Sequence, residues 1–359
     1  MAGLWVRAET KAHERRTPLL PRQAAALVAR GHPVVVERSS MRVIGDSDYE
    51  AVGCRLVPPG AWTEAPEDYF ILGIKELPPA DFPLRHRHIY FAHCYKGQQH
   101  SEQVLNRFVA GGGTLLDMEY LTDSSGVAVI VKELDRLSGY VGAAMALGFF
   151  FQKAAGGAPS LGRPYYPDRT SLLAAIGAAA RAVGRHPSVV VIGYRGNAGR
   201  GATQLCREAS IDPVLWGRAE TGSPGVLATL NRFEVVVHCI GTDQAGPPFL
   251  TADDLHVGSR VSVLADVTCD VGSPVHRYPF YSQITTFDDP VLVVGPAAAP
   301  VHVIAIDHLT TWLPYEASAA IAEPLVVQLQ ALLAGGPDRW PGPWRRTLDL
   351  FAEGSAHLR

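Results

Sequence analysis

The sequence has few cysteines, and they show no pairing pattern. Five cysteines are scattered over 359 residues, their number is odd, and no C-x-x-C motif occurs. A disulfide framework needs paired cysteines and a structural zinc site needs closely spaced ones, so the pattern argues against both. This usage is typical of a reducing compartment, and we expect a cytoplasmic protein.

Long apolar runs and a strong net charge are also absent. The most apolar stretch, residues 143–151, is much shorter than the roughly 18 residues that cross a bilayer. The first residues show none of the regions of a secretory signal. Since the formal net charge is only −3, nothing suggests a polyanionic partner. We therefore expect neither a membrane nor a nucleic acid as a partner.

Histidine is frequent, but the histidines do not form a metal-ligand pattern. Two of the 13 histidines lie in the segment Arg85-His86-Arg87-His88. No carboxylate or thiol stands at ligand spacing around them. We interpret this segment as a solvated basic loop and predict no metal site.

The sequence is rich in β-branched apolar runs that alternate with Ala/Leu-rich segments, a pattern typical of parallel sheets with crossover helices. A chain of 359 residues exceeds what one hydrophobic core usually serves. We predict an α/β protein of two Rossmann-like domains with parallel sheets and a cleft between them. The predicted strands are residues 4–6, 34–36, 70–72, 88–92, 114–116, 188–192, 235–237, 261–264, 291–294 and 301–306. The predicted helices include residues 22–30, 170–183, 202–208 and 324–333.

A glycine-spaced turn follows the strand at residues 188–192 and precedes a predicted helix. In this context Gly193 permits the tight turn, Gly196 lets the backbone approach a pyrophosphate, and Gly199 allows close helix packing. The spacing is G-x-x-G-x-x-G, and an ordinary strand-turn-helix crossover is the alternative interpretation. The apolar strand before the turn favours a dinucleotide site.

The choice of nicotinamide cofactor depends on the end of the next strand. An acidic residue there usually holds a ribose 2′-hydroxyl, but this sequence has Gly217-Arg218. Arg218 favours a 2′-phosphate and therefore NADP. Alternatively, Arg218 is a solvent-facing charge and Glu220 contacts the ribose, so NAD and NADP both remain candidates.

In the first half of the chain, polar residues follow the ends of apolar strands. Lys75 follows one strand and His93 another, and parallel strand ends converge where ligands bind. A partly buried lysine and a histidine near neutrality could move protons at a carbon–nitrogen centre. Taken singly, each is more often a surface lysine or a core histidine.

Several motifs are spread over nearly the whole chain, at residues 7–11, 14–16, 71–76, 91–96, 113–119, 193–199, 306–309 and 313–318. Together they resemble those of the saccharopine dehydrogenase family, which is related to alanine dehydrogenase and to transhydrogenase nucleotide domains. Members of that family oxidise the secondary amine of saccharopine with NAD, and water splits the resulting imine into lysine and 2-oxoglutarate.

The resemblance implies roles for named residues. Lys75 and His93 would be the acid–base pair, and the three glycines of the turn would hold the pyrophosphate. The domain plan would be discontinuous, with a substrate domain of residues 1–131 and 318–359 and a dinucleotide-binding domain of residues 132–317. Four further residues would line the cleft and handle substrate charges, namely Arg16, Glu76, Glu119 and Asp307.

Three departures from the family pattern concern the ligands. Val129 and Ile130 stand where the family has an Arg-Arg pair for a substrate carboxylate, and Tyr315 stands where it has another arginine. Lys132 or Arg136 could compensate, but losing a bidentate carboxylate partner usually means a different ligand or a different binding mode. Third, Gly217 replaces the acidic residue expected at the cofactor ribose.

We predict an NAD(P)-dependent oxidoreductase of the saccharopine or opine type, which cleaves or forms the secondary amine between an amino acid such as lysine and a 2-oxo acid. A homologue from specialised metabolism, acting on another N-substituted lysine-like compound, is the second interpretation. A catalytically silent nucleotide-binding sensor is the third. The expected partner is a small amino-acid substrate, the cofactor is NAD or NADP, and a monomer fits the sequence.

Overall fold

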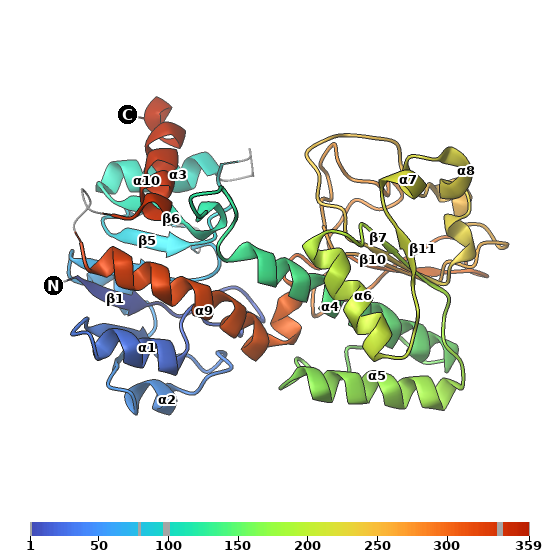
Figure 1. Ribbon diagram of the computed structural model, residues 1–359, viewed down its shortest axis with the longest axis horizontal. Coiled ribbons are helices and arrows are strands. Elements are labelled where there is room, and N and C mark those ends of the chain that lie inside the picture. The colour runs from blue at the N-terminus through green and yellow to red at the C-terminus, as the bar shows by residue number, and fades with distance from the viewer. Residues whose placement is uncertain (1, 78–79, 96–100, 336–339, 359) are drawn as a thin grey trace. The chain divides into compact units, whose positions relative to one another are not determined.

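The computed structural model describes residues 2–77, 80–95, 101–335 and 340–358, and it divides the chain into two compact units. Unit 1 comprises Met1–Lys132 and Pro314–Arg359, and unit 2 comprises Glu133–Leu313. Each unit contains one six-stranded sheet (Figure 1). Within the described ranges, none of the helices has the length and apolar character that a membrane span requires.

The sheet of unit 1 is parallel throughout, in the order β3-β2-β1-β4-β5-β6. Its central strands are apolar and buried on both faces, as expected where helices cover both sides of a parallel sheet. The strands are β1 (Gly3–Val6), β2 (Val34–Glu37), β3 (Arg55–Val57), β4 (Tyr69–Leu72), β5 (Arg87–Tyr90) and β6 (Thr114–Asp117).

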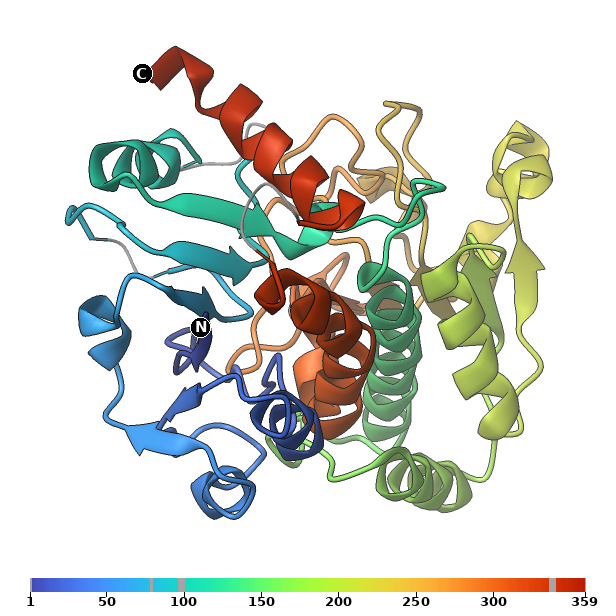
Figure 2. The ribbon, with the colours of Figure 1, turned by 60° about the vertical axis from the view of Figure 1, so that its left-hand side comes forward.

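The helices of unit 1 pack on its sheet, and α1 and α9 lie side by side (Figure 2). Pro21 starts α1, because the first helical position needs no N–H donor, and Gly31 follows its end with a φ of 86°. The helices are α1 (Pro21–Val28), α2 (Asp46–Glu50), α3 (Ser101–Gly111), α9 (Pro314–Leu333) and α10 (Gly342–Gly354), and the short 3-10 helices are Ala61–Glu64, Met118–Tyr120 and Ala356–Leu358.

Two sequence predictions for unit 1 are wrong. The helix predicted at residues 324–333 begins at Pro314, and Pro324 lies inside it rather than at its start. In the segment predicted as a solvated basic loop the two histidines are buried, with His86 and His88 only 1% and 0% exposed, while Arg85 is exposed. There β5 begins at Arg87, whose guanidinium lies 4.3 Å from the Phe70 ring centroid. Burial lowers the pKa of both histidines, so they are neutral core side chains.

The sheet of unit 2 has the order β11-β12-β10-β9-β7-β8 and is parallel except for β11. At this edge β11 pairs antiparallel with β12. Only residues 295–300 join the two strands, which is too short for a crossover connection. The strands are β7 (Val189–Ile192), β8 (Val214–Trp216), β9 (Val235–His238), β10 (Val263–Asp266), β11 (Leu292–Val294) and β12 (Val301–Ile304).

Helix α6 of unit 2 crosses α4 at unusually close range. A Cβ added to Gly139 would lie 1.8 Å from the Ala198 carbonyl oxygen, and one added to Gly201 would lie 1.8 Å from that of Arg136. The two glycines therefore let the helix backbones touch. The helices are α4 (Val131–Ala154), α5 (Arg169–Val183), α6 (Asn197–Glu208), α7 (Arg218–Thr221) and α8 (Pro224–Leu227), and the 3-10 helices are Leu230–Arg232, Ala252–Asp254 and Leu309–Trp312.

Candidate active site

The candidate site of unit 1 lies at the carboxyl ends of four neighbouring strands. In the order β1-β4-β5-β6 all strands are parallel, so the segments that follow them meet along one edge of the sheet. Arg7 follows β1, Lys75 follows β4, His93 follows β5 and Glu119 follows β6. One edge thus gathers charged side chains from segments far apart in the sequence.

His93 is held between two carboxylates. Its Nε2 lies 3.7 Å from Glu76 Oε1, and its Nδ1 lies 3.5 Å from Glu119 Oε2. Its backbone has a φ of 50°, a left-handed conformation that non-glycine residues rarely adopt and that often marks functional sites. The imidazole is 40% exposed, so it can reach a ligand. The structure thus brings together three of the predicted site residues.

Asp117, the last residue of β6, is a further carboxylate at this edge, and the sequence-based site did not include it. It is 1% exposed, and burial raises its pKa to about 6. Its Oδ1 accepts a hydrogen bond of 2.9 Å from the Glu119 backbone N–H. The sequence contained one signal for this residue. An aspartate at the end of an apolar strand has little access to water, and such burial perturbs its pKa.

Lys75 is buried at the same edge, at 7% exposure. The Glu9 carboxylate accepts hydrogen bonds from the backbone N–H groups of Ile74 (2.7 Å) and Lys75 (3.0 Å). The Arg7 guanidinium donates to the Lys75 carbonyl oxygen. A Cβ at Gly73 would lie 2.3 Å from Arg7 Nε, so only glycine leaves room for this arginine. The backbone around Lys75 is therefore fixed from two sides.

Arg16 forms a buried pair with Glu14. Its Nε donates to Glu14 Oε1 at 2.7 Å and its Nη2 to Oε2 at 2.5 Å, which is bidentate geometry. Burial alone would raise the pKa of Glu14, but the charge and hydrogen bonds of Arg16 outweigh it and lower that pKa. The charge of Lys75 adds to the lowering. Lys75 and Arg16 therefore share an electrostatic environment.

In unit 2 the predicted glycine turn joins β7 to α6. Gly193 has a φ of 85°, and a Cβ at Gly199 would lie 2.1 Å from the Gly193 carbonyl oxygen, so both positions need glycine. A Cβ at Gly196 would come no nearer than 3.5 Å to that oxygen. Packing therefore does not require glycine at position 196. This open position beside the helix N-terminus fits the close approach of a pyrophosphate.

The end of β8 has an unusual arrangement around Gly217. Its N–H donates to Glu220 Oε2 at 2.7 Å, and this bond lowers the pKa of Glu220. A Cβ at Gly217 would lie 3.3 Å from Cε1 of Tyr194, so the tyrosine ring covers the strand end. Arg218 is exposed at the first position of α7. The carboxylate of Glu220 thus caps the backbone of α7.

Asp307 belongs to unit 2, unlike the other predicted substrate residues. It follows β12, and its carboxylate is hydrogen-bonded to Nδ1 of His308. The Asp307 side chain is 36% exposed, whereas that of His308 is 7% exposed. The structure therefore presents an accessible carboxylate supported by a buried imidazole.

A buried network at the ends of β9 and β10 was not predicted. His238 Nδ1 lies 3.0 Å from Asp266 Oδ1, and Tyr281 donates to Asp266 Oδ2 at 2.5 Å. Burial would raise the pKa of Asp266, but these partners lower it. The predicted strand at residues 261–264 stopped short of Asp266, because the apolar run ends before the strand does. Among the described residues, no group of three or more His, Cys, Asp or Glu side chains could hold a metal ion.

The comparisons with known proteins extend over nearly the full length. A saccharopine dehydrogenase [NAD(+), L-lysine-forming] of Neurospora crassa is 39% identical over 99% of this chain and 97% of that protein. The enzyme of the same name from Emericella nidulans is 38% identical over 99% and 98%. The chain belongs to the saccharopine dehydrogenase family. The resemblance identified from the motifs is therefore confirmed.

More distant relatives support the fold assignment. The family model "Alanine dehydrogenase/PNT, N-terminal domain" matches residues 5–134. A solved L-alanine dehydrogenase superposes with a TM-score of 0.68 at 18% identity, covering 98% of this chain and 94% of that one. The predicted α/β fold with two Rossmann-like sheets is confirmed.

The positions that depart from the family pattern lie in unit 1. Ile130 is buried at 1% exposure, and the backbone N–H of Val129 donates to the Leu121 carbonyl oxygen at 2.9 Å. Tyr315 is 49% exposed at the second position of α9. None of these side chains can supply the positive charge that the resemblance implies there.

Proposed function

We propose that this protein is a nicotinamide-dependent dehydrogenase that acts on the CH–NH bond of a secondary amine joining an amino acid to a 2-oxo acid. The observation that carries the proposal is His93, held between Glu76 and Glu119 at the sheet edge that also holds Lys75. Family membership supports the reaction class, since the relatives are named as NAD(+) enzymes that form L-lysine.

The residues present fit a dinucleotide at the turn of unit 2. Gly196 leaves room for a pyrophosphate, and the first turn of α6 offers backbone N–H groups to it. A bound nicotinamide would supply the hydride acceptor for the carbon beside the amine nitrogen. We assign the pyrophosphate to Gly193, Gly196 and Gly199. Arg218 remains a candidate contact for the ribose end, and NAD and NADP are both compatible with this turn.

The proton transfers fall to unit 1. Lys75 and His93 take up the proton that the amine nitrogen loses and the proton that water gives up when it adds to the imine carbon. They return a proton to the nitrogen as the C–N bond breaks and the amino acid leaves. Glu76 and Glu119 hold the imidazole and compensate its positive charge. Arg16 and Asp307 remain proposed substrate contacts, suited to a substrate that carries both carboxylate and ammonium groups.

Product analysis tests this function directly. Purified protein is incubated with saccharopine and either NAD+ or NADP+, and lysine, 2-oxoglutarate and reduced cofactor are quantified. We expect the three products in equal amounts from the parent and a large loss in Lys75→Met. Binding of NADH and NADPH, with a circular dichroism melt, serves as the folding control. Equal product formation by the parent and Lys75→Met would reject the proposed role.

The substrate could instead be another N-substituted lysine-like compound. Ile130 is buried and Tyr315 is exposed at positions where the family resemblance implies arginines, and this observation favours the second candidate. A ligand lacking one carboxylate of saccharopine loses nothing when those arginines are absent. The comparison of kcat/KM for saccharopine with that for N-carboxyalkyl amino acids of fewer carboxylates separates the two candidates.

A further inference from the structure

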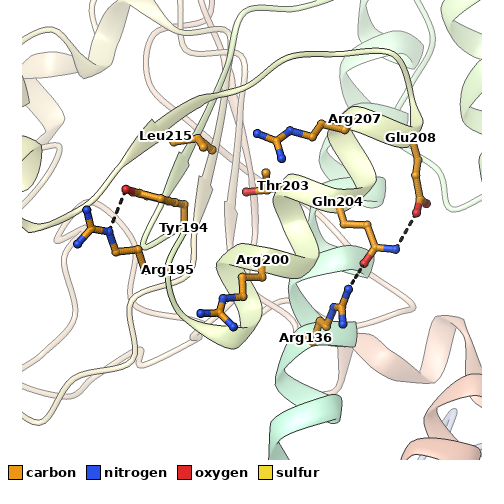
Figure 3. A pocket seen from close by; sticks show the side chains of 9 residues that line it. All are labelled: Arg136, Tyr194, Arg195, Arg200, Thr203, Gln204, Arg207, Glu208 and Leu215. Carbon is orange, nitrogen blue, oxygen red and sulfur yellow. Dashed lines mark hydrogen bonds between the residues drawn. The ribbon is translucent and has the colours of Figure 1, made fainter.

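A hollow of about 640 Å³ lies beside α6 in unit 2, and its volume is within the range of small-molecule sites. Figure 3 shows the side chains that line it, coming from α4, the glycine turn, α6 and β8. Four of them are arginines, Arg136, Arg195, Arg200 and Arg207. We call this feature the arginine hollow.

The hollow follows from the helix period and from the strand order. Arg200, Thr203 and Arg207 recur at spacings of three and four, which places them on one face of α6. Leu215 of β8 lines the opposite wall. Since β8 is the outer strand of its sheet, no further strand of the described ranges covers this face. The arginines are exposed as a consequence.

The charge of the hollow is strongly positive. Glu208 is the one carboxylate among its lining residues, and both its oxygens accept hydrogen bonds, from Tyr140 at 2.6 Å and Gln204 at 2.7 Å. Within the part of the chain that the structure describes, neither Arg200 nor Arg207 has an ion pair or a hydrogen bond to a side chain. The hollow is therefore suited to an anion.

The position of the hollow identifies which anion. Two lining residues, Tyr194 and Arg195, are the residues between Gly193 and Gly196 of the turn. In a Rossmann unit the adenosine ribose lies between this turn and the end of the second strand, here β8. Arg195 Nε donates to the Tyr194 hydroxyl at 2.9 Å, so its guanidinium is held against the tyrosine that adjoins the end of β8.

The Tyr194 ring lies against the position of the missing acid. It lies 3.3 Å from where a Cβ at Gly217 would be, so a side chain at that position would require the ring to shift by a few tenths of an ångström. A ribose bound here therefore meets no carboxylate from position 217 itself. It meets the Glu220 carboxylate, which is held on the Gly217 N–H, together with Arg195, whose charge helps to lower the pKa of Glu220. Arg218 does not line the hollow, which distinguishes it from Arg195 and Arg200.

We propose that the arginine hollow is a phosphomonoester site for the 2′-phosphate of NADP(H), with Arg195 and Arg200 as its ligands. This inference rests on the proposed function, because it requires a nicotinamide dinucleotide at the glycine turn. It assigns phosphate recognition to the turn and to α6, and it replaces Arg218 as the expected phosphate contact.

Fluorescence titration with NADPH and NADH tests the assignment. We expect the parent to bind NADPH about tenfold or more tightly than NADH, as two charge-assisted arginine–phosphate contacts would give. Arg195→Ala/Arg200→Ala should lose this preference while its NADH affinity changes less than about threefold. Arg181→Ala, which changes an exposed arginine of α5 outside the hollow, is the matched control and should match the parent.

The outcomes separate the two proposals. Equal parental affinities for NADPH and NADH, or equal losses of both in the double variant, would overturn the phosphate site and leave the dehydrogenase function standing. A loss of NADPH affinity in Arg218→Ala with none in Arg195→Ala/Arg200→Ala would also overturn it. Binding of neither cofactor by folded parent would overturn both proposals. Competition by 2′-AMP but not 5′-AMP, abolished in the double variant, supports the site.

Discussion

The two units share an architecture of six strands and differ in the chemistry that follows those strands. At the edge of unit 1, two carboxylates flank the His93 imidazole, and the buried Lys75 lies at the same edge. In unit 2, glycines open a backbone turn beside a hollow lined by arginines. Carboxylates next to titratable bases suit proton transfer, whereas arginines and open backbone amides suit phosphates. The two units therefore differ in the segments that follow their strands, and not in the sheets themselves.

Replacing His93 should have the largest effect on turnover and should leave the nucleotide affinity of unit 2 unchanged. His93→Gln removes the titratable group between the two carboxylates, and loss of a general acid–base residue costs about 10²–10⁴-fold in rate. We expect kcat to fall by such a factor. The glycine turn is untouched, so NADH and NADPH affinities should equal those of the parent in the same titrations. A variant with unchanged kcat would remove His93 from the reaction.

Asp117→Asn should change how the folding stability depends on pH. Burial raises the folded-state pKa of Asp117 from 3.8 to about 6, so between about pH 4 and 6 the folded state binds more protons than the unfolded state. Stability must therefore fall as pH rises through this window, by on the order of 1–3 kcal/mol.

Urea unfolding of the parent and Asp117→Asn at several pH values measures the effect. The variant should be the more stable of the two above about pH 6 and should show a smaller decline between about pH 4 and 6. An identical pH dependence in both proteins would show that Asp117 is not responsible for it.

Gly196→Ala sharpens the account of unit 2. The added Cβ meets only the Gly193 carbonyl oxygen at 3.5 Å, so the fold should be retained. The added Cβ would stand where the pyrophosphate approaches. We therefore expect NADH and NADPH to bind at least about tenfold more weakly, equal to a loss of about 1.4 kcal/mol in binding free energy. The control is Gly225→Ala in α8, where an added Cβ meets nothing within 4 Å. Equal affinities in the two variants would contradict the assignment.

Arg22→Ala should have the smallest effect. Its ion pair with Glu323 joins α1 to α9, but the two side chains are 65% and 55% exposed. Exposed pairs contribute roughly 0–1 kcal/mol. Urea unfolding should show a change within that range, and turnover should be unchanged. A larger destabilisation would mean that the contact between these helices depends on this pair.

The sequence predicted the features that depend on local pattern. Apolar strands, the glycine turn and the strand-end positions of Lys75 and His93 follow from periodicity and spacing. What it missed depends on tertiary contacts: the burial of His88, the network of His238 and Asp266, and the placement of the Tyr194 ring against Gly217. The family motifs named the candidate site residues, but motifs carry no information on burial.

The central claim is that unit 1 moves protons and unit 2 binds the nucleotide. Its most direct test measures kcat and the NADPH and NADH dissociation constants on the same preparations of Lys75→Met/His93→Gln and Gly196→Ala. The account predicts that the first variant binds both nucleotides like the parent while its turnover falls about 10²-fold or more, and that the second loses nucleotide affinity. A double variant that loses nucleotide affinity as severely as turnover would contradict the claim.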